Sequence, residues 1–156
     1  MKTKNVKRLP NEFLDTVVAR IHKTLGDNLV AVVLFGSYAK GVAREASDLD
    51  LLVIACALPG SRERSELLLY AFDDLVMKTG TTVMPILMTP DELRRDMEML
   101  GPLMFGLVTG YQIIWGKLSL LPKWERFVRS RYRLSRKFDA WIIKNPSSLQ
   151  PKPNLR

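Results

Sequence analysis

Apolar residues follow two different spacings in the first third of the chain. Between Asn11 and Gly26 they recur every three or four positions, which predicts a helix that starts near the first residue and stops at the second. Residues 29–35 (LVAVVLF) and 48–55 (DLDLLVIA) are short, largely apolar runs, the composition of buried strands. The chain is therefore expected to begin with a helix and two strands that share one core.

The middle of the chain alternates between helix and strand patterns in the same way. Thr89-Pro90-Asp91-Glu92 is a capping box with proline at the first helical position. The strand that precedes this box contains Pro85, which indicates a sheet edge or a bulge. The expected elements are a helix over 61–80, a strand over 82–88, a helix over 89–100, a second helix or hinge segment over 101–110 and a strand over 111–116. This order predicts an α/β (α+β) domain with a small mixed sheet flanked by helices.

The last quarter of the chain has a different pattern. Residues 124–144 space their apolar side chains as a helix does and carry Arg and Lys mostly on the other side, which predicts a long basic amphipathic helix. Residues 145–156 (NPSSLQPKPNLR) are polar and proline-rich, which predicts a flexible tail. We therefore divide the chain into a domain over 1–116, a C-terminal basic helical extension over 117–144 and a tail over 145–156.

The formal net charge of +8 is concentrated at one end of the chain. Residues 1–122 carry 14 Lys or Arg and 14 Asp or Glu, so the whole excess lies in residues 123–156. A neutral body with a basic C-terminal arm points to a polyanion or an acidic partner at that end. Three interpretations of the basic helix over 123–144 stay open. It docks on the sheet or on a second subunit of a homodimer, it contacts RNA or an acidic protein, or it lies on a membrane surface.

Composition excludes several classes of protein. No apolar run reaches the roughly 18–20 residues of a membrane span, and the first residues contain no apolar signal-peptide segment. Cys56 is the one cysteine, which excludes a disulfide framework and a Cys-based zinc site, and His22 is the one histidine, which excludes most His-based sites. We expect a cytoplasmic protein without disulfides and without a membrane span.

Two carboxylates open the second predicted strand. Asp48 and Asp50 are separated by one residue, and positions i and i+2 of a strand share a face. Carboxylate oxygens are the ligands that Mg²⁺ (or Mn²⁺) takes in proteins, usually one or two of them, with water and substrate phosphate completing the shell. Asp48 and Asp50 are therefore predicted to be both the metal ligands and the catalytic residues.

Small and basic residues lie between the first strand and this pair. Gly36 has no Cβ, so a phosphate can approach its backbone, and Ser37 adds a hydroxyl next to amide donors at a helix start. Lys40 and Arg44 follow on the same loop, where their charges can neutralise a phosphate tail. With the metal pair, these four residues predict that a nucleoside triphosphate binds here and that its nucleotidyl group is transferred with metal assistance.

The motif Gly36-Ser37, ten residues, Asp48-Leu49-Asp50 resembles that of the polymerase-β-like nucleotidyltransferase superfamily. The chain's small size is similar to the superfamily's minimal nucleotidyltransferase branch, and the resemblance extends over residues 11–116. It implies transfer of a nucleoside monophosphate, AMP from ATP by default or the equivalent from another NTP, to a hydroxyl of a protein or small molecule with Mg²⁺. Many members of that branch resemble the antitoxin of a toxin–antitoxin pair, so a helical HEPN-type protein partner is implied as well.

One acid that the resemblance implies is absent. In active members a third carboxylate on a later strand completes the metal cage and can act as base, but the matching strand over 82–88 has no Asp or Glu, and its expected position holds Met84. Asp73, Asp74 and Asp91 are near in sequence but lie in predicted helices. Two hypotheses stay open: an active nucleotidyltransferase, or a catalytically weak or inactive module that binds nucleotide, RNA or a protein partner.

Overall fold

A four-stranded mixed sheet forms the centre of the molecule in the computed structural model, which describes residues 6–147 and 152–156. Its strands are β1 (Leu29–Phe35), β2 (Leu49–Ala55), β3 (Val83–Met88) and β4 (Tyr111–Gly116), in the order β3-β2-β1-β4. β1 runs antiparallel to both β2 and β4, whereas β2 and β3 are parallel. The predicted mixed sheet is confirmed, and the strand that contains Pro85 lies at an edge as expected.

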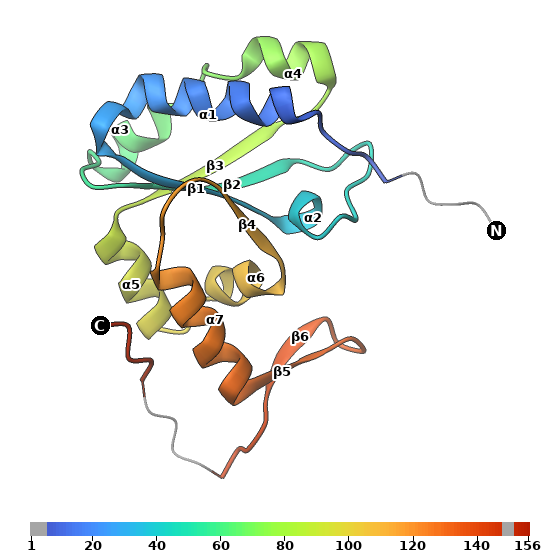
Figure 1. The fold of residues 1–156 in the computed structure, drawn as a ribbon, viewed down its shortest axis with the longest axis vertical. Coiled ribbons are helices and arrows are strands. Elements are labelled where there is room, and N and C mark those ends of the chain that lie inside the picture. The colour runs from blue at the N-terminus through green and yellow to red at the C-terminus, as the bar shows by residue number, and fades with distance from the viewer. Residues whose placement is uncertain (1–5, 148–151) are drawn as a thin grey trace, which may run out of the picture.

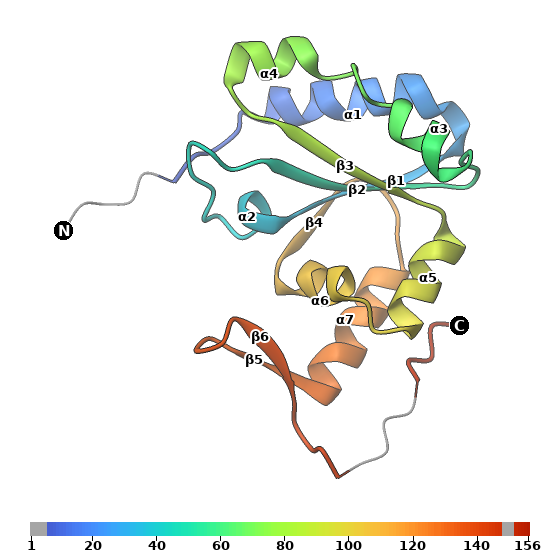
Figure 2. The same ribbon diagram turned by 180° about the vertical axis from the view of Figure 1, so that it is seen from behind.

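Helices cover both faces of this sheet (Figures 1 and 2). The elements on one face are α1 (Asn11–Leu25), α3 (Ser61–Glu66) and α4 (Asp73–Thr79), and those on the other are α5 (Pro90–Glu98), α6 (Pro102–Thr109) and α7 (Leu120–Arg131). Two short helices, η1 (Gly26–Asn28) and α2 (Gly36–Ala39), lie before and after β1. Because side chains alternate along a strand, Leu51 and Val53 of β2 pack toward α1, and Leu52 and Ile54 pack in the core beneath α5, α6 and α7. The same alternation determines on which side of the sheet each site residue of β2 lies.

The helix predicted over 61–80 is divided into α3 and α4, which turns separate. Nη1 of Arg20 in α1 donates to the carbonyl oxygen of Ala71. In a continuous helix this carbonyl would accept a hydrogen bond from a backbone amide of the next turn. The same guanidinium is paired with the carboxylate of Asp74, in the first turn of α4. A carboxylate is stabilising at a helix N-terminus, so α4 has a favourable start of its own. Contacts with α1 thus override the continuous helical pattern.

The helix predicted over 124–144 is wrong in its second half. α7 is amphipathic and basic as expected, but it ends at Arg131, and β5 (Tyr132–Ser135) and β6 (Ala140–Ile143) form an antiparallel hairpin. Tyr132 is buried and packs edge-on against Phe105 of α6, with ring centroids 5.0 Å apart, and the indole of Trp141 donates to the carbonyl of Phe105 at 3.0 Å. An extended backbone brings both rings onto α6.

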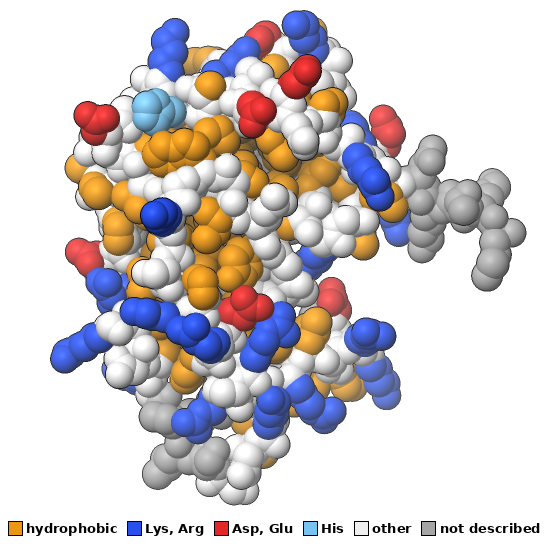
Figure 3. All heavy atoms as spheres, viewed as in Figure 1, with side chains coloured by type: hydrophobic (Ala, Val, Ile, Leu, Met, Phe, Trp, Pro, Cys, Tyr) orange, Lys and Arg blue, Asp and Glu red, His pale blue; other side chains and the backbone are white. Residues whose placement is uncertain are grey.

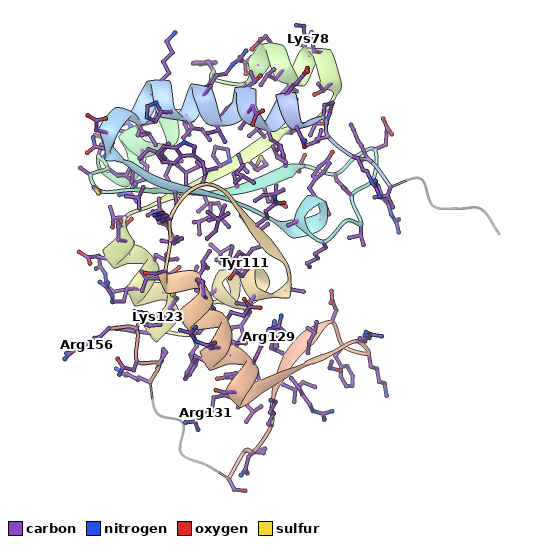
Figure 4. The ribbon with its side chains drawn as sticks, viewed as in Figure 1. Lys78, Tyr111, Lys123, Arg129, Arg131 and Arg156 are labelled. Carbon is purple, nitrogen blue, oxygen red and sulfur yellow. The ribbon has the colours of Figure 1, made fainter. Side chains whose placement is uncertain are left out.

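Within the tail predicted over 145–156, the last described residues contact the body of the protein. Leu155 is only 4% exposed and joins the core beneath α5, α6 and α7, and Lys123 of α7 donates to the carbonyl of Arg156 at 3.2 Å (Figure 4). Residues 148–151 lie outside the described part. In the described ranges, none of the helices combines the length and the apolar character that crossing a membrane requires.

Candidate active site

Gly36 and Asp50 are in direct contact at one end of the sheet. β1 ends at Phe35, whose register partner in β2 is Asp50, so α2 starts beside that carboxylate. Gly36 has a φ of +69°, and a Cβ added there would collide with Oδ2 of Asp50. Both the backbone conformation and the space therefore require glycine at this position.

Asp48 and Asp50 form an interacting pair of carboxylates. Asp50 shares its side of β2 with Leu52 and Ile54, the side of α5, α6 and α7, and Asp48 lies one residue before the strand, exposed. Burial raises the pKa of the Asp50 carboxyl above its ordinary value, and the negative charge of Asp48 raises it further. A bound cation would offset both effects, since it favours the charged form of each carboxylate.

The two carboxylates fit a Mg²⁺ ion of the kind that substrate phosphates help to bind. Mg²⁺ takes one or two carboxylates, keeps several waters and completes its shell with phosphate oxygens. Among residues 6–147 and 152–156, no three His, Cys, Asp or Glu side chains gather into a cation site. Asp48 and Asp50 are thus a pair of carboxylates that could hold such an ion together with water and substrate oxygens.

The position of the expected third acid is occupied by Met84. In the parallel pair of β2 and β3, Asp50 and Met84 are register partners, and Met84 is 49% exposed. Asp74 is paired with Arg20 on the opposite face of the sheet, and Asp91 with Arg94 on α5 at 2.9 Å. These nearby acids are engaged elsewhere, so they do not replace the carboxylate that Met84 lacks.

The other predicted residues separate into two groups. Ser37 follows Gly36 in α2 and is close to Asp50 in the fold, and its carbonyl accepts a hydrogen bond from the amide of Val42 at 3.0 Å. Lys40, one turn later, extends toward α6, where its Cγ would lie 2.9 Å from a Cβ added at Gly110. Arg44 lies on the exposed loop before β2, and its amide donates to Oγ of Ser47 at 2.8 Å.

Sequence reasoning missed a polar pair beside this end of the sheet. Tyr111 of β4 is the register partner of Phe35, and its hydroxyl donates to Oε2 of Glu125 on α7 at 3.0 Å (Figure 4). Burial raises the pKa of Tyr111 to about 12, with the hydrogen bond and charge of Glu125 adding to the effect. Glu125 also accepts from Nε of Arg129 at 2.9 Å. Of these contacts, that of Glu125 with Arg129 has a recognisable sequence pattern, an acid and a base spaced i and i+4 on a helix.

A row of side chains thus crosses the sheet at the edge where the motif lies: Met84, Asp50, Phe35 and Tyr111, one from each strand. A family model described as nucleotidyltransferase domain matches residues 17–99, which include the whole Gly36 to Asp50 motif. The chain belongs to the nucleotidyltransferase domain family. The family predicted from the motif is confirmed.

A curated relative supports the same assignment for this nucleotidyltransferase. The chain is 38% identical over 112 residues to a protein of Methanocaldococcus jannaschii named "Putative protein adenylyltransferase MJ1305". The matched region covers 71% of this chain and 75% of the relative. This relationship extends well beyond the fifteen-residue motif itself.

Solved structures share the fold of this nucleotidyltransferase. One is the spectinomycin adenyltransferase AAD(9) from Enterococcus faecialis with ATP and spectinomycin, with a TM-score of 0.54, 17% identity and coverage of 71% of this chain and 58% of that one. Another is a toxin–antitoxin structure with AMP-PNP, with a TM-score of 0.50, 21% identity and coverage of 74% and 83%. At these identities the likeness is one of fold, and it confirms the predicted fold class.

Proposed function

We propose that this nucleotidyltransferase transfers AMP from ATP to a hydroxyl group of a protein and releases pyrophosphate, with Mg²⁺ held by Asp48 and Asp50. The observation that carries the proposal is the contact of Gly36 with Asp50, next to the exposed Asp48. At this contact the backbone of a glycine, which suits phosphate, lies beside two carboxylates that suit a divalent cation. The relative named as a protein adenylyltransferase supports AMP as the group and a protein as the acceptor.

Each residue of the motif has a distinct part in this proposal. Gly36 leaves room for the Asp50 carboxylate against its backbone, and Ser37 offers its hydroxyl to the triphosphate. Lys40 and Arg44 neutralise phosphate charge from the loop that follows α2. When bound, Mg²⁺ supplies positive charge to the phosphates and lowers the pKa of the attacking hydroxyl.

The register of Met84 with Asp50 favours a second candidate function. Within the row that the structure describes across this sheet edge, Asp50 is the one acid, so a third carboxylate that would take the proton of the acceptor is missing there. A catalytically weak or inactive module that binds nucleotide and a partner would need only the remaining groups. The two candidates predict the same nucleotide binding and differ in turnover.

The partner follows from the resemblance and remains a prediction. A helical HEPN-type toxin is the candidate acceptor, and the fold shared with a toxin–antitoxin structure supports that choice. The basic residues of α7 and the β5–β6 hairpin gather on one part of the surface, which Figure 3 shows as a blue region below the neutral body. RNA is the second candidate partner of that surface. A homodimer through it stays a prediction as well.

The test is transfer of label from α-labelled ATP to the protein encoded beside this chain, with Mg²⁺ present. The proposal predicts labelling by the wild type and its loss in Asp48→Asn and in Asp50→Asn, which remove charge and keep shape. Asp15→Asn, an exposed acid of α1, is the matched control and keeps full activity. Equal labelling by the wild type and by Asp48→Asn would contradict the enzyme. Intact ATP binding without any labelling would favour the binding module.

A further inference from the structure

A cavity of about 620 Å³ lies between α6 and the β5–β6 hairpin. Its lining comes from three parts of the chain: Lys40 just after α2, Phe105, Gly106 and Thr109 of α6, and residues of the hairpin that include Trp141 and Asp139. In Figure 1 the hairpin lies beyond α6 as seen from the sheet, so this space is outside the main core. The volume falls within the range of roughly 300–1,000 Å³ that small-molecule sites occupy.

The aromatic walls of this cavity are fixed in place. Nε1 of Trp141 donates to the carbonyl of Phe105 at 3.0 Å and to the hydroxyl of Thr109 at 3.3 Å, which sets the plane of the indole. Phe105 packs edge-on against both Tyr132 and Trp124, with centroids 5.0 and 5.7 Å apart. The cavity is therefore formed before any ligand arrives, which reduces the cost of binding.

Trp141 lines this space and also contacts the helix that precedes the hairpin. The guanidinium of Arg129 lies over the indole, 5.9 Å from its centroid, so one face is covered, and the residue still lines the cavity. The lining contains one cation, Lys40, and one anion, Asp139. Such a site suits a planar, uncharged aromatic ring better than a phosphate, because phosphate would meet the carboxylate and the apolar walls.

The cavity is joined to the nucleotide motif through Lys40. The amide of Lys40 donates to the carbonyl of Gly36 at 3.1 Å, so one helical turn separates the cavity from the glycine that touches Asp50. The stem of Lys40 then crosses α6 at Gly110, where the missing side chain makes room for it. A ligand with a charged end at Gly36 and a flat, neutral end in the cavity would extend along this path.

We propose that the cavity between α6 and the β5–β6 hairpin binds the nucleobase of the donor nucleotide, stacked on Trp141, while Lys40 meets its phosphates. The proposal rests on the proposed function, because it assigns the base of the same nucleoside triphosphate whose phosphates are placed at Gly36. It makes Trp141 a binding residue and gives the hairpin a role in donor recognition.

Gly106→Leu is the sharpest test of this assignment. A Cβ added at Gly106 meets nothing within 4 Å, and the position is in a helix, so leucine fills the cavity without removing a contact and is compatible with folding. Calorimetry with the full chain and Mg²⁺ would compare ATP with inorganic tripolyphosphate, which has the charge but no base. We expect the wild type to bind ATP at least about tenfold more tightly than tripolyphosphate, the scale of one stacked base.

Gly106→Leu and Trp141→Ala should each remove that advantage and leave the affinity for tripolyphosphate unchanged, and Trp141→Phe should keep most of it. Phe138→Ala, on the same hairpin but outside the cavity lining, is the control and should bind ATP as the wild type does. Unchanged ATP binding by Gly106→Leu overturns the base site even if AMP transfer is observed. Loss of the advantage without any AMP transfer supports the base site and contradicts the enzyme. A wild type that binds neither ligand overturns both.

Discussion

Asp50 of β2 and Met84 of β3 are register partners in a parallel pair of strands, and their side chains share the side of the sheet that carries α5, α6 and α7. A carboxylate introduced at Met84 would therefore lie beside the existing pair. Met84→Asp is predicted to tighten Mn²⁺ or Mg²⁺ binding in the presence of nucleotide by about tenfold, equivalent to about 1.4 kcal/mol. AMP transfer should rise in the same direction. Metal titration by calorimetry or Mn²⁺ resonance measures the first effect.

The control for this change is Met77→Asp, which adds the same charge at an 87% exposed position on α4. It should leave metal affinity unchanged. If both variants behave alike, or if Met84→Asp weakens metal binding, the register partner of Asp50 is not part of the cation site.

Gly36→Ala is predicted to disable the site because its Cβ would displace the Asp50 carboxylate. Gly41→Ala is a matched control, since Gly41 has a φ of +68°, almost that of Gly36, but open space around its Cβ. Both variants lose stability through the left-handed backbone, by about 1–2 kcal/mol. Gly36→Ala should lose about 1–3 kcal/mol more through the collision, and AMP transfer should fall at least tenfold. Chemical denaturation and the labelled-ATP assay measure the two effects, and equal losses in the two variants would contradict the contact.

Ionisation of Tyr111 should be detectable above the ordinary range for tyrosine. Its pKa in the folded protein is raised to about 12, so the neutral phenol is favoured by folding. The associated stability is fully present below the unfolded pKa of about 10 and is lost as pH rises through about 12. Absorbance titration of the phenolate measures this pKa when the titration of Tyr111→Phe is subtracted from that of the wild type. Glu125→Gln should lower it only in part, because burial is the largest cause; an ordinary pKa in the wild type would contradict the buried pair.

RNA binding, if it uses the basic surface of α7 and the hairpin, should depend on salt in proportion to the phosphates contacted. Arg133→Gln with Arg136→Gln removes two exposed charges of that surface. For single-stranded RNA the slope of log K against log salt should then fall by up to about 1.4, or about 0.7 per lost contact. Arg62→Gln, an exposed arginine of α3, is the control. A wild-type affinity that is insensitive to salt would exclude this mode of binding.

Leu155→Ala tests the described end of the chain. Leu155 is 4% exposed within the core beneath α5, α6 and α7, so its truncation should cost about 2 kcal/mol or more of the free energy of unfolding. Asn154→Ala, exposed next to it, should change stability by less than about 0.5 kcal/mol. A freely flexible tail would instead make the two variants equivalent in thermal or chemical unfolding.

Most of the fold was predictable because its signals are local. The strand runs, the capping box at Thr89 and the edge position required by Pro85 each depend on a few adjacent residues, and the structure confirms all of them. The resemblance put the position of the third acid at Met84, and the structure makes Met84 the register partner of Asp50. Asp48, Asp50 and Gly36 could be assembled in advance since they flank one connection between adjacent strands.

The rest depends on contacts between distant parts of the chain. Residues 132–143 have apolar spacing compatible with a helix, whereas contacts with α6, such as the packing of Tyr132 on Phe105 and the hydrogen bond from Trp141, favour a hairpin there. Leu155 likewise reads as part of a polar, proline-rich segment until α7 provides a surface for it. The Tyr111 and Glu125 pair needs β4 and α7 to be placed first. No local pattern contains that information.

The division of the site between near and distant parts of the chain has a consequence for the order of folding. Gly36 and Asp50 meet through one short connection, so this half can form as soon as β1 and β2 pair. The cavity is lined by both Lys40 and Trp141, and Trp141 emerges from the ribosome about a hundred residues after Lys40. A growing chain would therefore position Asp48 and Asp50 before its cavity could bind a nucleobase. The phosphates of the donor could then bind before the hairpin docks, and its base only afterwards.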